Sequence, residues 1–379
     1  MAEDFRHSAL FYSGLDEYVH QTTAFLRAGI AAGEPALVVI APEKTALLRE
    51  ELGKDAARVT FADMQAVGRN PARIIPAWRV FVDANLGPGR PVRGIGEPIW
   101  AERSADELVE CERHEALLNL AFAGSLEWSL LCPYDTQSLP DAVLEEARRN
   151  HALLIEHGSH RTSDVCLELD EIARPFDVPL PPAPLQAATF ELEPETLGAF
   201  RRFLSDAAER EGLADRVSSF ALAVHEVATN SLRHGGGRAS VRLWSTASAV
   251  VCEVRDAGRI VDPLVGRVRP DHEGEGGWGV WMANQLCDLV QVRAVADGTV
   301  VRVHMTKPAP VVICRTPWGE VHLDEQQYER VADSLWALGV SLPGAATAAT
   351  KLAEARRAGR TNVELDDRES PALERALLL

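Results

Sequence analysis

The sequence lacks a paired cysteine motif, a long apolar run and an apolar leader at its N-terminus. Its six cysteines are scattered and form no Cys-x-x-Cys, which excludes the usual zinc frameworks and a dense disulfide scaffold. No stretch approaches the ~18 apolar residues that a membrane helix requires. Residues 1–7 carry Glu3 and Asp4 in place of the apolar core of a signal peptide. We therefore expect a cytoplasmic protein with reduced thiols.

Positive charge is also scarce. The formal net charge is −17, and 39 basic residues face 56 acidic ones. Direct binding of nucleic acid or of an anionic membrane requires clustered Lys and Arg, so we expect neither partner. The hydrophobic share of 46% is ordinary for a globular protein. A length of 379 residues predicts two or three domains.

Two proline-rich segments divide the chain. Residues 175–184 contain five prolines, which favour an extended spacer over a helix or a central strand. A second break lies at 307–310, where Pro308 and Pro310 follow a strand-like run. The predicted organisation is a first domain at 1–172, a Pro-rich linker at 173–185, a second domain at 186–307 and a C-terminal extension at 308–379.

Strand and helix patterns alternate through the first domain, which predicts a three-layer α/β fold with a mainly parallel sheet. The expected strands are 9–12, 36–40, 91–95 and 126–132, and the expected helices are 18–30, 43–52, 105–121 and 142–157. The layout of residues 9–40 is RecA-like. However, the first loop offers Gly14 with Asp16 and Glu17 where a phosphate-binding lysine would stand. We expect the fold there without NTP hydrolysis.

The second domain has a different order of elements. The expected strands are 189–192, 239–244, 250–254, 290–295 and 300–304, and the expected helices are 197–210, 215–233 and 280–287. Asp297-Gly298 predicts a hairpin between the last two strands. We expect a two-layer α+β sandwich. A short α/β extension follows, with strands at 311–314 and 320–323 and helices at 325–338 and 348–358.

Three short motifs in the second domain indicate one nucleotide site. Glu226 and Asn230 stand four residues apart on one side of a helix. Asp256-Ala257-Gly258 comes where a strand ends. Gly277 and Gly279 lead into a helix, where bare backbone amides favour phosphate. Each motif alone is commonplace, as a solvated helix face, a turn or a flexible loop. Their joint order predicts a nucleotide pocket.

The residue types suit that chemistry. Asn230 supplies an oxygen ligand suited to Mg²⁺, and Glu226 is placed to orient or deprotonate an attacking hydroxyl or water. Asp256 can accept a hydrogen bond from the exocyclic amine of adenine, which would select adenine over guanine. Gly258 lets the backbone approach the ring closely.

The second domain resembles the GHKL ATPases, and within them the RsbW-type anti-sigma factors, which are serine kinases of bacterial partner-switching systems. Glu226-x-x-x-Asn230-x-x-x-His234-Gly235 matches their N box, Asp256-Ala257-Gly258 their first glycine box and Gly277-x-Gly279 their second. The resemblance implies binding of Mg-ATP, with His234 also at the nucleotide. It further implies phosphorylation of a serine or threonine on a STAS-type antagonist, and sequestration of a sigma factor.

Two departures leave alternatives open. Ile260 stands where the first glycine box usually has a second glycine, and the segment 260–276 carries several carboxylates. Extra carboxylates near phosphates weaken the expectation of catalysis more than that of binding. One alternative is a non-catalytic module in which ATP only stabilises a partner-binding surface. The other is a sensor histidine kinase, which the lack of a phosphoacceptor segment disfavours.

The first domain resembles the MEDS sensory domain of bacterial regulators. The matching segments are Asp16-Glu17, Phe25-Leu26-Arg27-x-Gly29, Ala32-Gly33-Glu34-Pro35, Gly96-Glu97-Pro98-x-Trp100 and Leu131-Cys132-Pro133-Tyr134-Asp135. The resemblance implies control of the second domain by a small molecule, of which a hydrocarbon-like compound is one option; the motifs do not define the ligand. The pocket candidates are Glu97, Trp100, Tyr134 and Asp135. A structural role is the stronger alternative for each of the four, since Trp and Tyr are usually buried for packing. A homodimer is left open.

The histidines give weaker patterns. Arg113-His114-Glu115 and His225-Glu226 superficially match a phosphoacceptor histidine, but neither adjoins a two-helix dimerisation segment. His151, His157 and His160 do not fall on one helical face, so we expect no metal site from their spacing.

Overall fold

The computed structural model describes residues 5–87, 89–124, 127–167, 171, 179–211, 213, 216–246, 248–270, 277–307, 312–323, 325–339, 341–358 and 361–377. The chain divides into two compact units, Met1–Thr306 and Lys307–Leu379. The first unit contains two sheets. We call residues 5–167 the N-terminal lobe and residues 179–306 the second lobe. Among the described residues no helix is both long and apolar enough to cross a bilayer.

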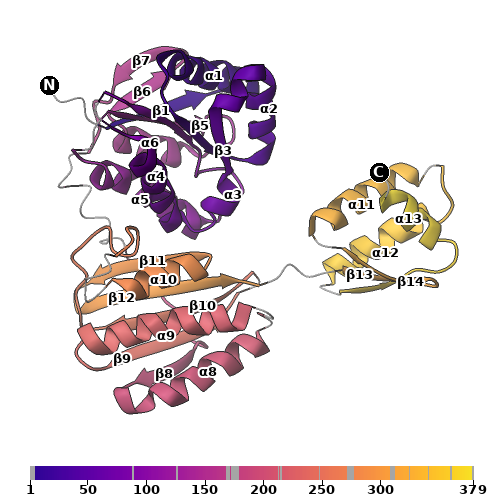
Figure 1. Ribbon diagram of the computed structural model, residues 1–379. Helices are drawn as coiled ribbons and strands as arrows, with labels where there is room; N and C mark the ends of the chain where they lie inside the picture. Colours follow the sequence, from indigo (N-terminus) through magenta and orange to yellow (C-terminus); the bar gives the residue numbers. More distant parts are fainter. Residues whose placement is uncertain are drawn as a thin grey trace. The chain divides into compact units, whose positions relative to one another are not determined.

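The N-terminal lobe is built on a sheet of seven strands in the order β3-β2-β4-β5-β1-β6-β7 (Figure 1). The strands are β1 (Arg6–Tyr12), β2 (Ala36–Ile40), β3 (Val59–Asp63), β4 (Val92–Gly96), β5 (Trp128–Asp135), β6 (Leu153–Glu156) and β7 (Ser159–Thr162). Every neighbouring pair is parallel except β6 and β7. The predicted mainly parallel sheet is confirmed.

Helices cover both faces of this sheet. They are α1 (Leu15–Ala32), α2 (Pro42–Leu52), α3 (Met64–Val67), α4 (Ile74–Asn85), α5 (Ala105–Ala121) and α6 (Asp141–Asn150), with 3-10 turns η1 (Gly53–Arg58) and η2 (Pro71–Arg73). Because successive strand side chains point to opposite faces, β1 places Leu10 in one core with α1 and α2. The adjacent Phe11 enters another core with α4, α5 and α6. The result is the predicted three-layer α/β lobe.

One element of this lobe differs from the prediction. Instead of a helix over 142–157, α6 ends at Asn150 and β6 pairs with β1 in parallel. Leu154 is completely buried in the α4–α6 core, and His157 and Gly158 both have positive φ, which turns the chain into β7. Residues 153–156 form a strand and not a helix because the strand pairs with β1 and buries apolar side chains against the sheet. Elements β3, α3, α4, β6 and β7 were not predicted.

The second lobe is a two-layer sandwich. Its sheet has the order β11-β12-β10-β9-β8, with every neighbouring pair antiparallel. The strands are β8 (Ala188–Leu192), β9 (Ala239–Ser245), β10 (Ala249–Asp256), β11 (Leu289–Val295) and β12 (Gly298–Thr306), and the helices are η3 (Pro194–Thr196), α8 (Leu197–Arg210), α9 (Val217–His234) and α10 (Trp278–Leu286). Helices α8, α9 and α10 share one apolar core with one face of the sheet. This is the predicted α+β sandwich, including the β11–β12 hairpin.

The second unit has its own core. Its sheet has the order β14-β13-β15. The elements are β13 (Val312–Thr316), β14 (Gly319–Leu323), α11 (Glu325–Leu338), α12 (Ala345–Arg357), β15 (Asn362–Glu364) and α13 (Ser370–Leu377). The sequence predicted the hairpin and both longer helices, but neither β15 nor α13.

Candidate functional site

The three predicted nucleotide motifs meet at one cavity of the second lobe. Helices α9 and α10 lie side by side over the sheet (Figure 1), and a cavity of about 320 Å³ opens between them and the ends of β10 and β12. That volume is in the range of small-ligand clefts, roughly 300–1,000 Å³. Of the predicted residues, the cavity is lined by Asn230, His234, Asp256, Gly258 and Gly277. Glu226 and Gly279 lie outside its lining.

The carboxylate of Asp256 is held in a fixed orientation at the last position of β10. Ser231 on α9 donates a hydrogen bond from Oγ to Oδ2 over 2.5 Å, and the Gly258 amide donates to Oδ1 over 2.7 Å. A carboxylate has about four lone-pair positions, so these two bonds orient Asp256 and leave acceptor capacity toward the cavity. An amine such as the exocyclic group of adenine fits that capacity.

The backbone approach at Gly258 requires glycine. A Cβ at this position would lie 2.6 Å from the carbonyl oxygen of His234 and 2.9 Å from Asp256 Oδ1. The carbonyl of Gly258 accepts a hydrogen bond of 2.8 Å from Thr299 Oγ1 on β12. The loop after Asp256 is therefore held between α9 and β12, and its backbone at Gly258 lines the cavity.

Ser231 and Thr299 line the cavity but were not predicted. Ser231 directly follows the predicted Asn230, and Thr299 directly follows the predicted hairpin turn at Asp297-Gly298. Position next to a motif was thus the only signal for them in the sequence.

Helix α10 begins against the polar side of α9. A Cβ at Gly279 would lie 2.1 Å from Asn230 Nδ2 and 3.1 Å from the carbonyl oxygen of Glu226, so the glycine permits this contact. Gly277 has φ 86° and caps α10 at the edge of the cavity. Gly279 is buried in the helix contact, and its role toward phosphate stays a prediction. Asn230 and Glu226 are half-buried, whereas His234 is exposed.

The segment that follows Asp256 is anchored at its base to the N-terminal lobe. We call residues 260–270 the lid base; the carboxylates at 271, 273 and 275 and the glycines at 274 and 276 lie outside the described residues. Ile260 lines the cavity and packs against the core of the second lobe. Leu264 packs against the core of the N-terminal lobe that contains α4, α5 and α6. The two lobes thus share the lid base.

A buried ion cluster reinforces this anchor. Glu110 on α5 accepts hydrogen bonds from Arg267 of the lid base over 3.0 Å and from Arg293 on β11 over 2.7 Å. Glu110 and Arg293 are each only 2% exposed at their side chains, and Arg267 is 8% exposed. Arg113, one turn along α5, lies 3.2 Å from the same carboxylate. With the solvent excluded, the carboxylate depends on these guanidinium groups for its charge compensation.

A second connection passes through α10. Asn70 of the N-terminal lobe donates to the carbonyl oxygens of Asn284 and Cys287 at 3.2 and 3.3 Å. Asn284 Nδ2 in turn donates to the Gly266 carbonyl over 2.9 Å. The lid base is therefore tied to the N-terminal lobe directly at Arg267 and through α10 at Gly266.

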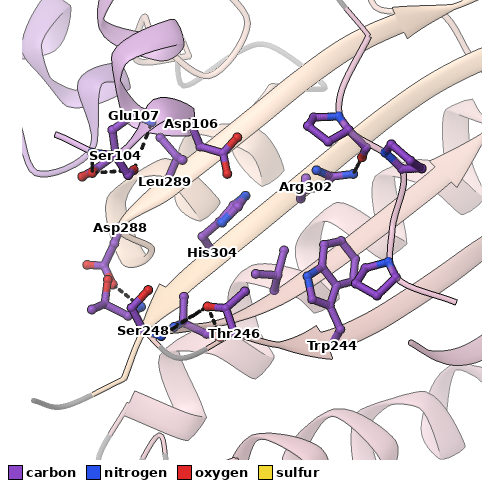
Figure 2. Close-up of a pocket in the computed structure, with 16 residues that line it drawn as sticks. Ser104, Asp106, Glu107, Trp244, Thr246, Ser248, Asp288, Leu289, Arg302 and His304 are labelled. Atoms are coloured by element: carbon purple, nitrogen blue, oxygen red, sulfur yellow. Dashed lines mark hydrogen bonds between the residues drawn. The ribbon is translucent and has the colours of Figure 1, made fainter. Parts of the chain in front are cut away.

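A second cavity, of about 570 Å³, lies on the sheet face opposite the helices of the second lobe (Figure 2). Arg302 donates to the carbonyl of Pro181 in the Pro-rich linker and lies over the Trp244 ring. Ser104, Asp106 and Glu107 at the start of α5 form another part of the wall. Burial lowers the pKa of His304 to about 4 there, with Arg302 adding to the effect. The linker and α5 thus meet on this face of the sheet.

The four predicted sensory residues are not brought together. Glu97 is buried, and Lys44 from α2 lies 2.6 Å away while Tyr12 donates to it over 3.0 Å. Burial raises the pKa of Glu97, an effect that Lys44 opposes. Asp135 shares a cavity of about 490 Å³ with Lys44 and the loop after β1. Lys44 therefore supplies the cation that the sequence of that loop lacks.

The other two residues lie elsewhere. Trp100 packs against Arg103, whose guanidinium carbon is 3.8 Å from its ring centre. Tyr134 is buried between Phe11 and His151. Glu97 and Asp135 stay candidates for a sensory pocket near Lys44, and the roles of Trp100 and Tyr134 stay predictions.

Fold and cavity together define the second lobe as a nucleotide-binding sandwich attached to a three-layer α/β lobe. Comparison with family models agrees with this. Residues 190–305 match the histidine kinase-like ATPase domain, and residues 6–152 match MEDS, the methanogen/methylotroph, DcmR sensory domain. The chain is a fusion of these two domains, and the combination is that of an ATP-binding signalling protein with kinase-like activity. No curated protein matches the chain significantly.

Proposed function

We propose that the protein is an ATP-dependent serine/threonine protein kinase of the anti-sigma-factor type, controlled by its N-terminal lobe. The observation that carries the proposal is the cavity at Asp256, where an oriented carboxylate, a glycine wall and the N-terminus of α10 converge. These groups suit the three parts of ATP: an acceptor for the adenine amine, a flat surface for the ring and backbone amides for phosphate.

Two residues on α9 suit the binding of Mg²⁺ and the transfer of the γ-phosphoryl group. Asn230 lines the cavity next to the start of α10 and would hold Mg²⁺, which supplies charge neutralisation at the phosphates when it is bound. Glu226 lies one helical turn earlier and would accept the proton of the attacking serine or threonine hydroxyl. The hydroxyl oxygen forms the new bond to the γ-phosphorus, and ADP leaves.

The arrangement before the ATPase domain supports a separate protein as phosphate acceptor. The N-terminal lobe runs to β7 at Thr162, and the second lobe begins with β8 at Ala188. The described residues between them contain no pair of long helices that could carry a phosphoacceptor histidine. A STAS-domain antagonist as acceptor and a sigma factor as sequestered partner are the proposed partners.

The two anchors of the lid base support control by the N-terminal lobe. A ligand that changes the position of α5 would change the Glu110–Arg267 contact, and with it the lid base, which lines the cavity. Such control requires only that the ligand favours one of two positions of the lid.

Transfer of labelled phosphate tests the proposal. Incubation of the full chain with Mg²⁺, γ-labelled ATP and purified STAS-domain proteins is expected to label a serine or threonine of one of them. Glu226→Gln should lower the transfer rate by about 10²- to 10⁴-fold, the usual contribution of a general base, and should leave ATP affinity unchanged. Glu209→Gln, the same change at an exposed site on α8, serves as the control.

The other outcomes identify the alternatives. Label on a histidine of this chain would support a histidine kinase. Binding of ATP without any transfer would support the non-catalytic module, which the apolar Ile260 at the cavity wall favours. An absence of ATP binding would contradict the nucleotide site itself.

A further inference from the structure

Four metal-ligating side chains meet in the core of the N-terminal lobe, away from the nucleotide cavity. They are His7 on β1, Glu115 on α5, Cys132 on β5 and His151 just after α6, and their ligand atoms all lie within 4.8 Å of one another. Each of the four residues is at most 3% exposed. They come from segments up to 144 residues apart in the sequence, between positions 7 and 151. Neither family match assigns a role to them.

Three of the separations between ligand atoms are close to those of a tetrahedral centre. His7 Nε2 lies 3.1 Å from Glu115 Oε2 and 3.3 Å from Cys132 Sγ, and His151 Nε2 lies 3.2 Å from the same Glu115 oxygen. Zinc bonds of roughly 2.0–2.3 Å place neighbouring ligand atoms about 3.3–3.8 Å apart. Small side-chain shifts would suffice to surround an ion.

The outer nitrogens of both imidazoles are oriented as metal ligands require. Asn119 Nδ2 donates to the Asn150 carbonyl over 2.8 Å, which fixes the amide so that its Oδ1 faces His7 Nδ1 at 3.1 Å. His151 Nδ1 lies 2.7 Å from the Ala147 carbonyl oxygen. In the neutral rings both Nδ1 atoms therefore carry the hydrogen, and both Nε2 atoms, which lie 3.1 and 3.2 Å from Glu115 Oε2, have a free lone pair. Such outer hydrogen bonds are the usual support of metal-bound histidines.

The Cys132 thiol can donate to the lone pair of His7 Nε2, but the other neighbour of both lone pairs is the Glu115 carboxylate, which leaves the cluster short of positive charge. A carboxylate has no hydrogen to donate, and within the described residues Glu115 Oε1 and His151 Nε2 have no hydrogen-bond partner. Buried polar atoms are rarely left in that state. A proton on one imidazole would relieve only one contact, at the cost of a buried charged ring. A divalent cation satisfies all four groups at once.

We propose that the N-terminal lobe binds one zinc ion through His7 Nε2, His151 Nε2, Cys132 Sγ and a Glu115 carboxylate oxygen. Two imidazoles, one thiolate and one carboxylate are ligands that zinc accepts, and four protein ligands in a closed site are typical of structural zinc. Binding releases the thiol proton of Cys132 to solvent. The ion's two positive charges then balance one thiolate and one carboxylate, so the core is neutral.

The test is the metal content and the spectrum of the full-length protein. Because the site is closed, the chain should be expressed in medium with added Zn²⁺ or Co²⁺, so that the ion is present during folding. We expect about one zinc per chain by elemental analysis. The cobalt form should show the near-ultraviolet charge-transfer band of a thiolate ligand and the visible bands of tetrahedral Co²⁺. A wild-type cobalt preparation without the thiolate band would overturn the proposal.

Variants assign the band to its sulfur. Cys132→Ser is expected to lose the band, whereas Cys314→Ser, the same change at a buried free cysteine of the second unit, should keep it. A band that persists in Cys132→Ser would place the metal elsewhere. Should Cys132→Ser fail to fold, Asn119→Ala is the second variant, with an expected loss of about 10- to 100-fold in zinc affinity. These readouts do not involve ATP, so their failure is distinct from failure of the kinase proposal.

Discussion

Helices α5 and α9 are nearly equal in length, and each carries carboxylates, but the two helices bury these carboxylates to different degrees. On α5, Glu110 and Glu115 are almost completely buried. Guanidinium groups surround the first, and imidazoles and a thiol surround the second. On α9, Glu226 and Asn230 are half-buried beside an open cavity.

The difference separates two uses of a charged side chain. A buried carboxylate contributes only while its internal partners remain, because removal of one partner leaves the other charged and desolvated. A half-buried carboxylate or amide beside a cavity can exchange water for a ligand at little expense to the fold. Changes on α5 should therefore act mainly on stability, and changes around α9 mainly on nucleotide binding.

The largest expected effect is the loss of Glu110. Glu110→Ala leaves Arg267 and Arg293 buried without this carboxylate, so the free energy of unfolding of the first unit should fall by about 3–5 kcal/mol. Urea unfolding followed by tryptophan fluorescence measures it. Hydrogen exchange in residues 263–270 should also become faster, because Arg267 no longer holds the lid base.

Glu102→Ala is the control for this prediction. Glu102 is exposed and lies eight residues before Glu110, and its loss should change stability by less than about 0.5 kcal/mol. If Glu110→Ala behaved like this control, the α5 cluster would contribute nothing, and the contrast between the two helices would fail.

An intermediate effect is expected at Asp256, which α9 orients through Ser231. Asp256→Asn keeps the shape but exchanges one acceptor oxygen for a donor that faces the Ser231 hydroxyl, the Gly258 amide or the adenine amine. Loss of a hydrogen bond to a charged group costs about 1.5–3 kcal/mol, or roughly 10- to 100-fold in ATP affinity. Calorimetric titration with ATP measures it.

Asp262→Asn is the matched control, since Asp262 lines the same cavity and is exposed. We expect it to change ATP affinity by less than about threefold, the effect of an ordinary surface change. Equal losses in both variants would mean that the cavity senses net charge only, and that Asp256 does not read adenine.

The same contrast explains how far the sequence predicts each site. The predicted residues that line the cavity fall in short motifs, because α9, the end of β10 and the start of α10 each present neighbouring residues to the cavity. Asn230, Asp256 and Gly258 could therefore be found by spacing alone. Ser231 and Thr299 could not, because a hydroxyl beside a motif has no pattern of its own.

No short motif in the sequence marks Glu110 and Glu115 on α5. Glu115 lies beside His7 and His151 only because α5 packs against α6 and against the sheet that contains β1, and Glu110 meets Arg267 only because two lobes pack together. In the sequence these carboxylates are ordinary polar positions of a helix. His151 was considered as a ligand with His157 and His160, but its partners in the structure come from other strands and from α5. The parallel sheet and the sandwich were predictable because their patterns are local, whereas the short β6 was hidden in a helix-like run.

The smallest expected effect concerns pH, on the sheet face that α5 covers. Burial holds the pKa of His304 at about 4 against an ordinary 6.5, so the folded state keeps this ring neutral while the unfolded chain takes up a proton below pH 6.5. Its contribution to stability is therefore complete above pH 6.5 and is lost as the pH falls toward 4. Partial exposure reduces this contribution to the free energy of unfolding to on the order of 1 kcal/mol.

His304→Gln should therefore reduce the difference between the free energies of unfolding at pH 7 and pH 5, measured by urea unfolding. His225→Gln on α9 should have a smaller effect, because burial also lowers the pKa of that ring but leaves the ring more accessible to solvent. If the free energy of unfolding depended on pH equally in the two variants, burial of the two histidines would not differ in its effect, and the contrast between α5 and α9 would not extend to them.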